Sequence, residues 1–200
     1  ITNTLAAGAS GMIVALLVSQ MTTGRVQASD IMNGVLAGLV AITGSVNAVG
    51  VGQSIIIGGV GALAMLAVDR LLLRLRIDDA VGAVPVHLGA GIWGTLAVGL
   101  FADMTQLGFD TGMTRINLLV MQLVGVVVCG VWAFGLTYII FRIIDRFMPL
   151  RISEDDEKIG LNISEHGARN DLFNLFSVME QQQRTGDLSL RAPEEPLTHV

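Results

Sequence analysis

One ionisable side chain, His87, lies inside a long apolar and glycine-rich run between Asp79 and Asp103. A run of about 20 apolar residues is long enough to cross a bilayer as a helix, and His87 would lie roughly 12 Å into a helix that starts at Asp79. A polar side chain at that depth is costly and usually faces a cavity or a partner. Because a neutral imidazole both donates and accepts hydrogen bonds, His87 is the candidate functional residue of this run.

Residues near His87 are assigned weaker roles. Asp79 is expected to cap the start of the helix, where a carboxylate complements the helix dipole, or to pair with a nearby arginine; a substrate role is the alternative. Ala83 and Val84 lie about one turn before His87 and are candidates for lining the cavity that His87 would face. Pro85 predicts a kink, since proline removes a backbone hydrogen bond within a helix.

The composition is that of a membrane protein. Of the 200 residues, 52% are hydrophobic and only 14% are charged, whereas a soluble domain carries about 25% charged residues. Charge is balanced as far as Arg146, and the residues after it account for the net charge of −5. We therefore predict a neutral membrane part over residues 1–148, followed by an acidic tail.

The hydrophobic pattern predicts an all-α, polytopic membrane protein. Five apolar segments are long enough to be spanning helices: residues 1–20, 30–49, 54–73, 80–102 and 117–140. A small-xxx-small pattern at Gly34 and Gly38 predicts close helix packing in the second segment.

The arginines predict the orientation of these segments. By the positive-inside rule, the ends of spans one, three and five face the cytoplasm. The basic residues at those ends are Arg25, Arg70, Arg74, Arg76, Arg142, Arg146 and Arg151, with only Arg115 on the other side. The sequence therefore predicts a multi-pass protein of the plasma or inner membrane, with a cytoplasmic tail.

The remaining side chains are interpreted as structural. Cys129 lies in an apolar run and is expected to be a buried thiol, and Trp93 and Trp132 are expected to be packing residues. His166 and His199 in the tail have no metal-ligand company, so we predict no metal site and no cofactor. The sequence offers no enzymatic constellation and no nucleic-acid surface.

The tail is predicted to have two parts. Residues 149–167 are polar and loop-like, and residues 168–200 begin with an amphipathic helix over residues 168–183. The chain begins at Ile1 within an apolar segment, without an initiator methionine, and we expect it to be part of a longer chain.

Three segments together resemble the ammonium transporter family (Amt/Mep/Rh). They are RIDDAVGAVPVHLGAGIWGTLAVGLFA at residues 76–102, GVLAGLVAIT at residues 34–43 and LRISEDDEKIGLNISEHG at residues 150–167. Family members have eleven spans, of which the first ten form two inverted halves. The resemblance implies that this chain holds helices seven to eleven and the cytoplasmic tail, and that the protein is a homotrimer with a pore in each subunit.

The resemblance also implies a role for His87. In the family, two histidines stand side by side in a narrow apolar pore, and His87 matches the second of them. Ammonium is captured outside through cation–π contacts and hydrogen bonds, loses a proton and passes as NH3. One of the two inverted five-helix halves alone would leave polar side chains such as His87 and Asn33 uncovered.

Three functions remain open at this point. The first is ammonium transport, and the second is ammonium sensing, in which the tail passes occupancy to a fused kinase or cyclase module. The sensor hypothesis depends on the extension after Gly167 and on its GDLSLR stretch, which is similar to a HAMP-type linker. In addition, Asn162 stands where family tails usually carry an aspartate. The third and most generic reading is a helical structural subunit without a permeant.

Overall fold

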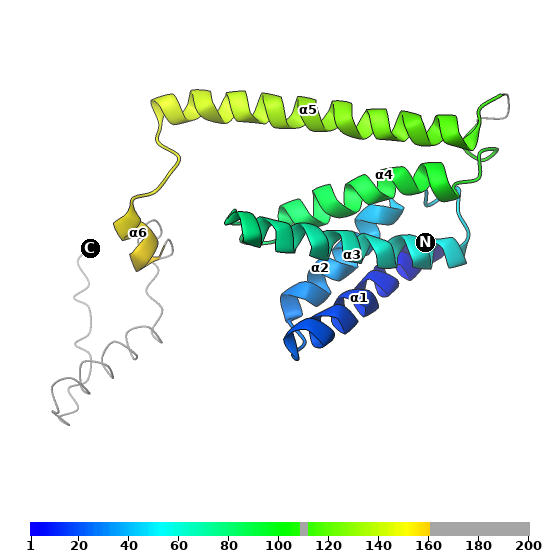
Figure 1. Ribbon diagram of the computed structural model, residues 1–200, viewed down its shortest axis with the longest axis horizontal. Coiled ribbons are helices and arrows are strands. Elements are labelled where there is room, and N and C mark those ends of the chain that lie inside the picture. Colours follow the sequence, from blue (N-terminus) through cyan, green and yellow to red (C-terminus); the bar gives the residue numbers. More distant parts are fainter. Residues whose placement is uncertain (109–111, 161–200) are drawn as a thin grey trace, which may run out of the picture. The chain divides into compact units, whose positions relative to one another are not determined.

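The computed structural model describes residues 1–108 and 112–160, and the secondary structure of those residues is entirely helical (Figure 1). This confirms the predicted all-α class. The elements are α1 (Thr2–Thr23), α2 (Ala28–Ile42), α3 (Val51–Leu75), the π-helical turn η1 (Pro85–Gly89), α4 (Ala90–Phe101), α5 (Arg115–Phe147) and α6 (Glu154–Ile159). The chain divides into an N-terminal unit, Ile1–Thr137, and a C-terminal unit, Tyr138–Val200, which we describe separately.

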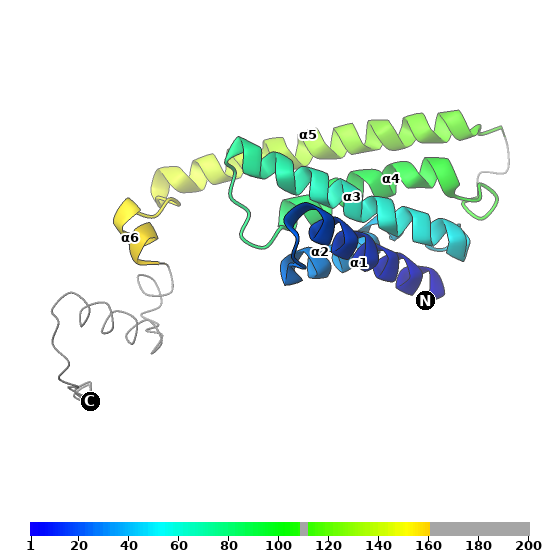
Figure 2. The same ribbon diagram turned by 60° about the horizontal axis from the view of Figure 1, so that its bottom comes forward.

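In the N-terminal unit, helices α1, α2 and α3 pack against one another, and η1 and α4 pack against α2 and α3 (Figure 2). Small residues make this packing possible. A Cβ atom added at Gly38 would meet the carbonyl oxygen of Ala7, and one added at Gly11 would meet the carbonyl oxygen of Gly34. The backbones of α1 and α2 therefore touch directly, as the small-xxx-small pattern predicts.

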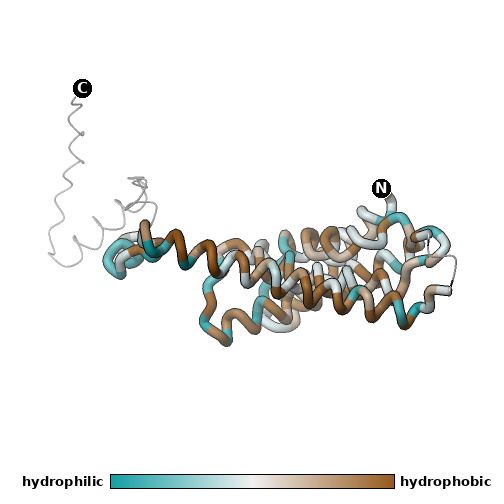
Figure 3. Tube along the Cα trace, turned by 90° about the horizontal axis from the view of Figure 1, so that it is seen from above, coloured by the Kyte–Doolittle hydropathy of each residue, from teal (hydrophilic) through white to brown (hydrophobic). Residues whose placement is uncertain are grey.

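Three helices, α1, α3 and α5, are long and apolar enough to cross a membrane by length and composition. The other two predicted spans are shorter apolar helices, Ala28–Ile42 and Pro85–Phe101. Hydrophobic residues run along the helices, and hydrophilic residues gather at their ends and in the turns (Figure 3).

The second span is shorter than predicted because a side chain from α1 stabilises a turn after Ile42. The Nδ2 atom of Asn3 donates to the carbonyl oxygens of Val46 and Val49, at 2.9 and 2.8 Å. These bonds satisfy carbonyl groups that a continuous helix would otherwise pair along its own axis. The chain thus leaves the helix at Ile42 and turns into α3.

The expectations for Cys129 and Trp132 are wrong for the chain described here. Cys129 is exposed, and Trp132 is 71% exposed. Both lie on α5, of which Leu118 is the buried residue. The apolar character of this helix gave no sign of which neighbours would cover it. Trp93 does pack as expected: its Nε1 donates to the carbonyl oxygen of Ile57 at 2.9 Å, and its ring meets Phe101 edge-on.

The C-terminal unit begins within α5. The Arg142 guanidinium lies 6.0 Å from the centre of the Tyr138 ring, and Asp145 accepts a hydrogen bond from the backbone N–H of Leu150 at 3.0 Å. Ser153 caps α6 by accepting from the N–H of Asp156 at 3.1 Å. The predicted tail beyond Gly160, including the amphipathic helix and Asn162, lies outside the described residues.

Candidate functional site

His87 lies in the π-helical turn η1, which opens the helix continued by α4. Helical backbone begins at Ala83, and His87 is therefore about 6 Å from the helix start rather than the 12 Å expected from Asp79. Pro85 falls in the first turn, where no helical partner is needed for its missing N–H. Pro85 thus lies at the start of the helix, where η1 begins, and the kink stays a prediction.

The turn η1 separates buried residues from exposed ones. Pro85, Val86 and Gly89 are buried, whereas His87 is exposed. A Cβ atom at Gly89 would lie 3.1 Å from the carbonyl oxygen of Ala64, so the glycine allows η1 to press against α3. This packing holds one side of η1 in the bundle and leaves the His87 side uncovered.

Ala83 and Val84 are exposed together with His87. Val84 has 40% of its surface exposed, and Leu88 has 50%. The exposed face of η1 and the two residues before it therefore offer an imidazole bordered by apolar side chains. We call these residues, Ala83, Val84, His87 and Leu88, the histidine face.

Asp79 lies before this helix and binds its first backbone N–H groups. Its Oδ1 accepts from the N–H of Ala83 at 3.0 Å, and its Oδ2 accepts from the N–H of Val84 at 2.7 Å. These donors, Val84 first, hold the pKa of Asp79 below its usual value because they stabilise the ionised carboxylate. Of the expected roles, capping is the one that these contacts support, and within the described residues Arg74 and Arg76 form no ion pair with Asp79.

Asn33, on α2, contacts the same segment before the helix, residues 79–82, which we call the lead-in. Its burial is intermediate, and its hydrogen bond to this segment is exposed, so Asn33 is covered only in part. The Nδ2 atom of Asn33 donates to the carbonyl oxygen of Val81 at 3.4 Å. Sequence reasoning singled out Asn33 only as a polar point in an apolar span, because its partner lies 48 residues away.

Polar residues also gather at the opposite end of the N-terminal unit. An open pocket of about 620 Å³ is bordered by the α2–α3 turn and the α4–α5 connection, with Gln53, Asp103 and Arg115 among its lining residues. Arg115 donates to the carbonyl oxygens of Gly99, Leu100 and Ala102, so it caps the end of α4. Arg115, a lining residue of this pocket, is thus engaged in contacts with the end of α4.

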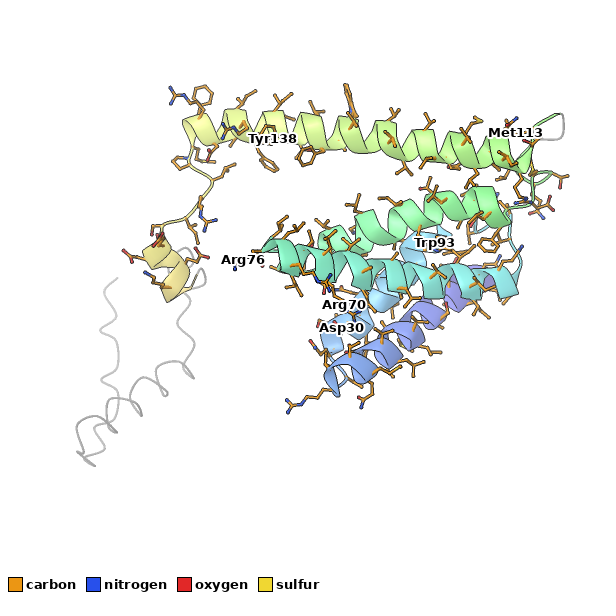
Figure 4. The ribbon with its side chains drawn as sticks, in the orientation of Figure 1. Asp30, Arg70, Arg76, Trp93, Met113 and Tyr138 are labelled. Atoms are coloured by element: carbon orange, nitrogen blue, oxygen red, sulfur yellow. The ribbon has the colours of Figure 1, made fainter. Side chains whose placement is uncertain are left out.

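Figure 4 shows where the labelled residues lie along the N-terminal unit. Asp30, Arg70 and Arg76 lie toward one end of the N-terminal unit, while Met113 lies at the other, and Trp93 lies between α3 and α4 (Figure 4). Within residues 1–108 and 112–160 no group of three or more His, Cys, Asp or Glu side chains is placed to hold a metal ion. The histidine face is thus the candidate site.

The chain is a bundle of apolar helices that approach one another closely at glycines, and a histidine lies in its π-helical turn. These features are those of an α-helical multi-pass membrane protein. The model of the Ammonium Transporter Family matches residues 1–171, and the chain belongs to that family. The family consists of transporters and not of enzymes.

Named relatives agree with this assignment. The chain is 46% identical, over 99% of its length, to a putative ammonium transporter, sll0537, of Synechocystis sp., and 34% identical, over 83%, to the ammonium transporter Amt2 of Archaeoglobus fulgidus. It covers 36% and 37% of those proteins, so it spans about a third of the length of these relatives.

Solved structures show the same fold. A structure titled Sensor Amt Protein matches 82% of this chain with a TM-score of 0.75 at 38% identity, and the chain covers 41% of it. Candida albicans Mep2 matches 78% of the chain with a TM-score of 0.68 at 32% identity, and the chain covers 36% of it. The fold is therefore Amt-like.

Proposed function

We propose that the intact protein moves ammonium across a cell membrane, and that the histidine face is this chain's contribution to the pore. His87 holds or relays a proton at an imidazole nitrogen, Ala83 and Val84 line the apolar wall beside it, and Asp79 caps the helix that carries all three. The intact protein acts as a homotrimer with its tail in the cytoplasm. Family membership supports the substrate, and the resemblance around His87 supports the residue roles.

One observation carries the proposal for His87. The imidazole is exposed on the N-terminal unit while Pro85, Val86 and Gly89 in the same turn are buried. A histidine with a purely structural role in an apolar bundle would be buried with its nitrogens bonded inside it. An uncovered imidazole in a membrane protein instead calls for a partner or a permeant outside this unit.

The transport experiment uses a His87→Ala variant of the intact protein. We expect methylammonium uptake, or its proton coupling, to change, because no other group of the histidine face can exchange a proton. Leu17→Ala, an exposed apolar truncation on α1, is the matched control and should leave uptake unchanged. Uptake and currents in His87→Ala equal to those of the wild type would remove His87 from the mechanism.

A second function, ammonium sensing, is favoured by a different observation. One similar structure is titled Sensor Amt Protein. The match to the putative transporter of Synechocystis sp. extends over 99% of this chain, so a protein named as a transporter shares the segment after Gly167. One of these two similar proteins is thus named as a transporter and the other as a sensor, although both share this fold.

Deleting residues 168–200 from the intact protein distinguishes the two functions. If the protein is a sensor, the deletion should disconnect ammonium from the downstream response while membrane insertion and uptake persist. A response to ammonium that survives the deletion contradicts the sensor hypothesis and leaves transport as the function.

A further inference from the structure

Asn33 is a half-buried amide in the apolar helix α2, and the transport proposal gives it no role. Its Nδ2 donates to the carbonyl oxygen of Val81, in the segment that leads into the histidine face. This hydrogen bond is 3.4 Å long and lies at an exposed position. It also joins α2 to the start of the helix that carries His87.

Gly82 completes the contact with Asn33. It is buried with a φ angle of 71°, a conformation that glycine adopts without strain. A Cβ atom at this position would lie 2.5 Å from the Nδ2 atom of Asn33. The amide of Asn33 therefore packs directly on the backbone of Gly82, and any larger residue would push the two apart.

The same short segment is held from its other side by Asp79. The Asp79 carboxylate binds the N–H groups of Ala83 and Val84, and the carbonyl oxygen of Gly82 accepts from the N–H of Val86 at 3.2 Å. The lead-in is thus fixed between Asp79 and Asn33 immediately before η1. Because successive residues of an α-helix are rotated by about 100°, a shift of one residue at the start would turn His87 away from its present face.

We propose that Asn33 is a positioning residue which, through Gly82, fixes the register of η1 and so sets the direction in which His87 faces. The inference rests on the proposed role of His87 but concerns a different residue on a different helix. Asn33 does not touch the permeant. It acts by holding the backbone of residues 81 and 82 against α2, which leaves one start point for the helix.

The experiment measures the orientation of His87 and transport separately in the intact protein. Asn33→Ala removes the amide, and Asn33→Leu keeps its volume but not its donor. The ring ¹⁵N resonances of His87, assigned by their loss in His87→Ala, should shift in both variants. Methylammonium uptake should fall roughly 10-fold to 100-fold, the scale of a misplaced group at a reacting centre. Asn47→Ala, an exposed asparagine in the turn after α2, should leave both unchanged.

The possible outcomes separate the two proposals. Shifted His87 resonances with normal uptake keep the positioning role and remove His87 from transport. Reduced uptake with unmoved His87 resonances overturns the positioning role. Gly82→Ala gives a second route to the same result: combined with Asn33→Ala, its effect on the His87 resonances should be less than additive, because both changes release one contact. Additive effects contradict the inference.

Discussion

Asp79 stabilises the start of the helix that carries His87 but is not part of the histidine face. Both of its oxygens accept backbone N–H groups at the start of the histidine-bearing helix. Those groups have no partner within the helix, so the side chain replaces water as their acceptor. The charge also complements the helix dipole. Capping was one of the roles expected for Asp79, and the helix begins at Ala83, four residues after Asp79.

Asp79→Asn should lower the thermal midpoint of the intact protein at neutral pH, because the amide is a weaker acceptor than the carboxylate. The pKa of Asp79 is lowered in the folded protein, so its contribution is present above the unfolded pKa of about 3.9 and is lost as the pH falls through the folded pKa. The midpoints of variant and wild type should therefore converge as the pH falls through the folded pKa of Asp79.

Asp78→Asn is the matched control, since this neighbouring aspartate is exposed. Thermal scans of all three proteins, from neutral pH down to a pH well below the unfolded pKa of about 3.9, make the comparison. A difference between Asp79→Asn and wild type that stays constant down to the lowest pH would show that the carboxylate charge is not what stabilises the helix start.

At the scale of elements, backbone contact between helices depends on glycines whose neighbours leave no room. Gly38→Ala should destabilise the intact protein by about 1 to 3 kcal/mol, the usual cost of overpacking, because the new Cβ would meet the Ala7 carbonyl. Gly125→Ala on α5 has open space around it and should be neutral or slightly stabilising. Thermal unfolding in detergent measures both, and equal losses would contradict the packing argument.

Element positions followed from hydrophobic pattern, but element ends did not. The pattern located all five apolar segments, because length and composition decide them. The end of α2 at Ile42 depends on Asn3, whose amide binds carbonyl groups more than 40 residues away. The π-helical turn, and the contact from Asn33 to Val81, likewise depend on packing between distant segments. Local sequence carries no sign of such contacts.

At the scale of the whole molecule, the uneven placement of the arginines predicts which side of the membrane each turn faces. Arg76 lies with Asp30 and Arg70 toward one end of the N-terminal unit (Figure 4). In a Cys129→Ser background, a cysteine at Arg76 should react with an impermeant maleimide only from the cytoplasmic side. A cysteine at Gln106 should react only from outside. Labelling of both from one side would refute the orientation inferred from the arginines.

Helix length varies more than twofold across the spanning part of the chain. By the α-helical rise, the 33 residues of α5 extend about 50 Å and the 15 residues of α2 only about 22 Å, against a hydrocarbon layer of about 30 Å. The short helix α2 has α1, α3, η1 and α4 as neighbours. Protein therefore covers part of this helix, while Met32 and Leu36 on it are 67% and 48% exposed.

A consequence follows for hydrophobic mismatch. A long helix at the lipid boundary can adapt to a thicker or thinner bilayer by changing its tilt, at a cost of fractions of a kcal/mol per Å. A short helix that packs against several other helices meets fewer acyl chains and feels a smaller force. We therefore expect a change in bilayer thickness to alter the tilt of the long helices first. The conformation of the lead-in, which Asn33 and Asp79 contact, should change less.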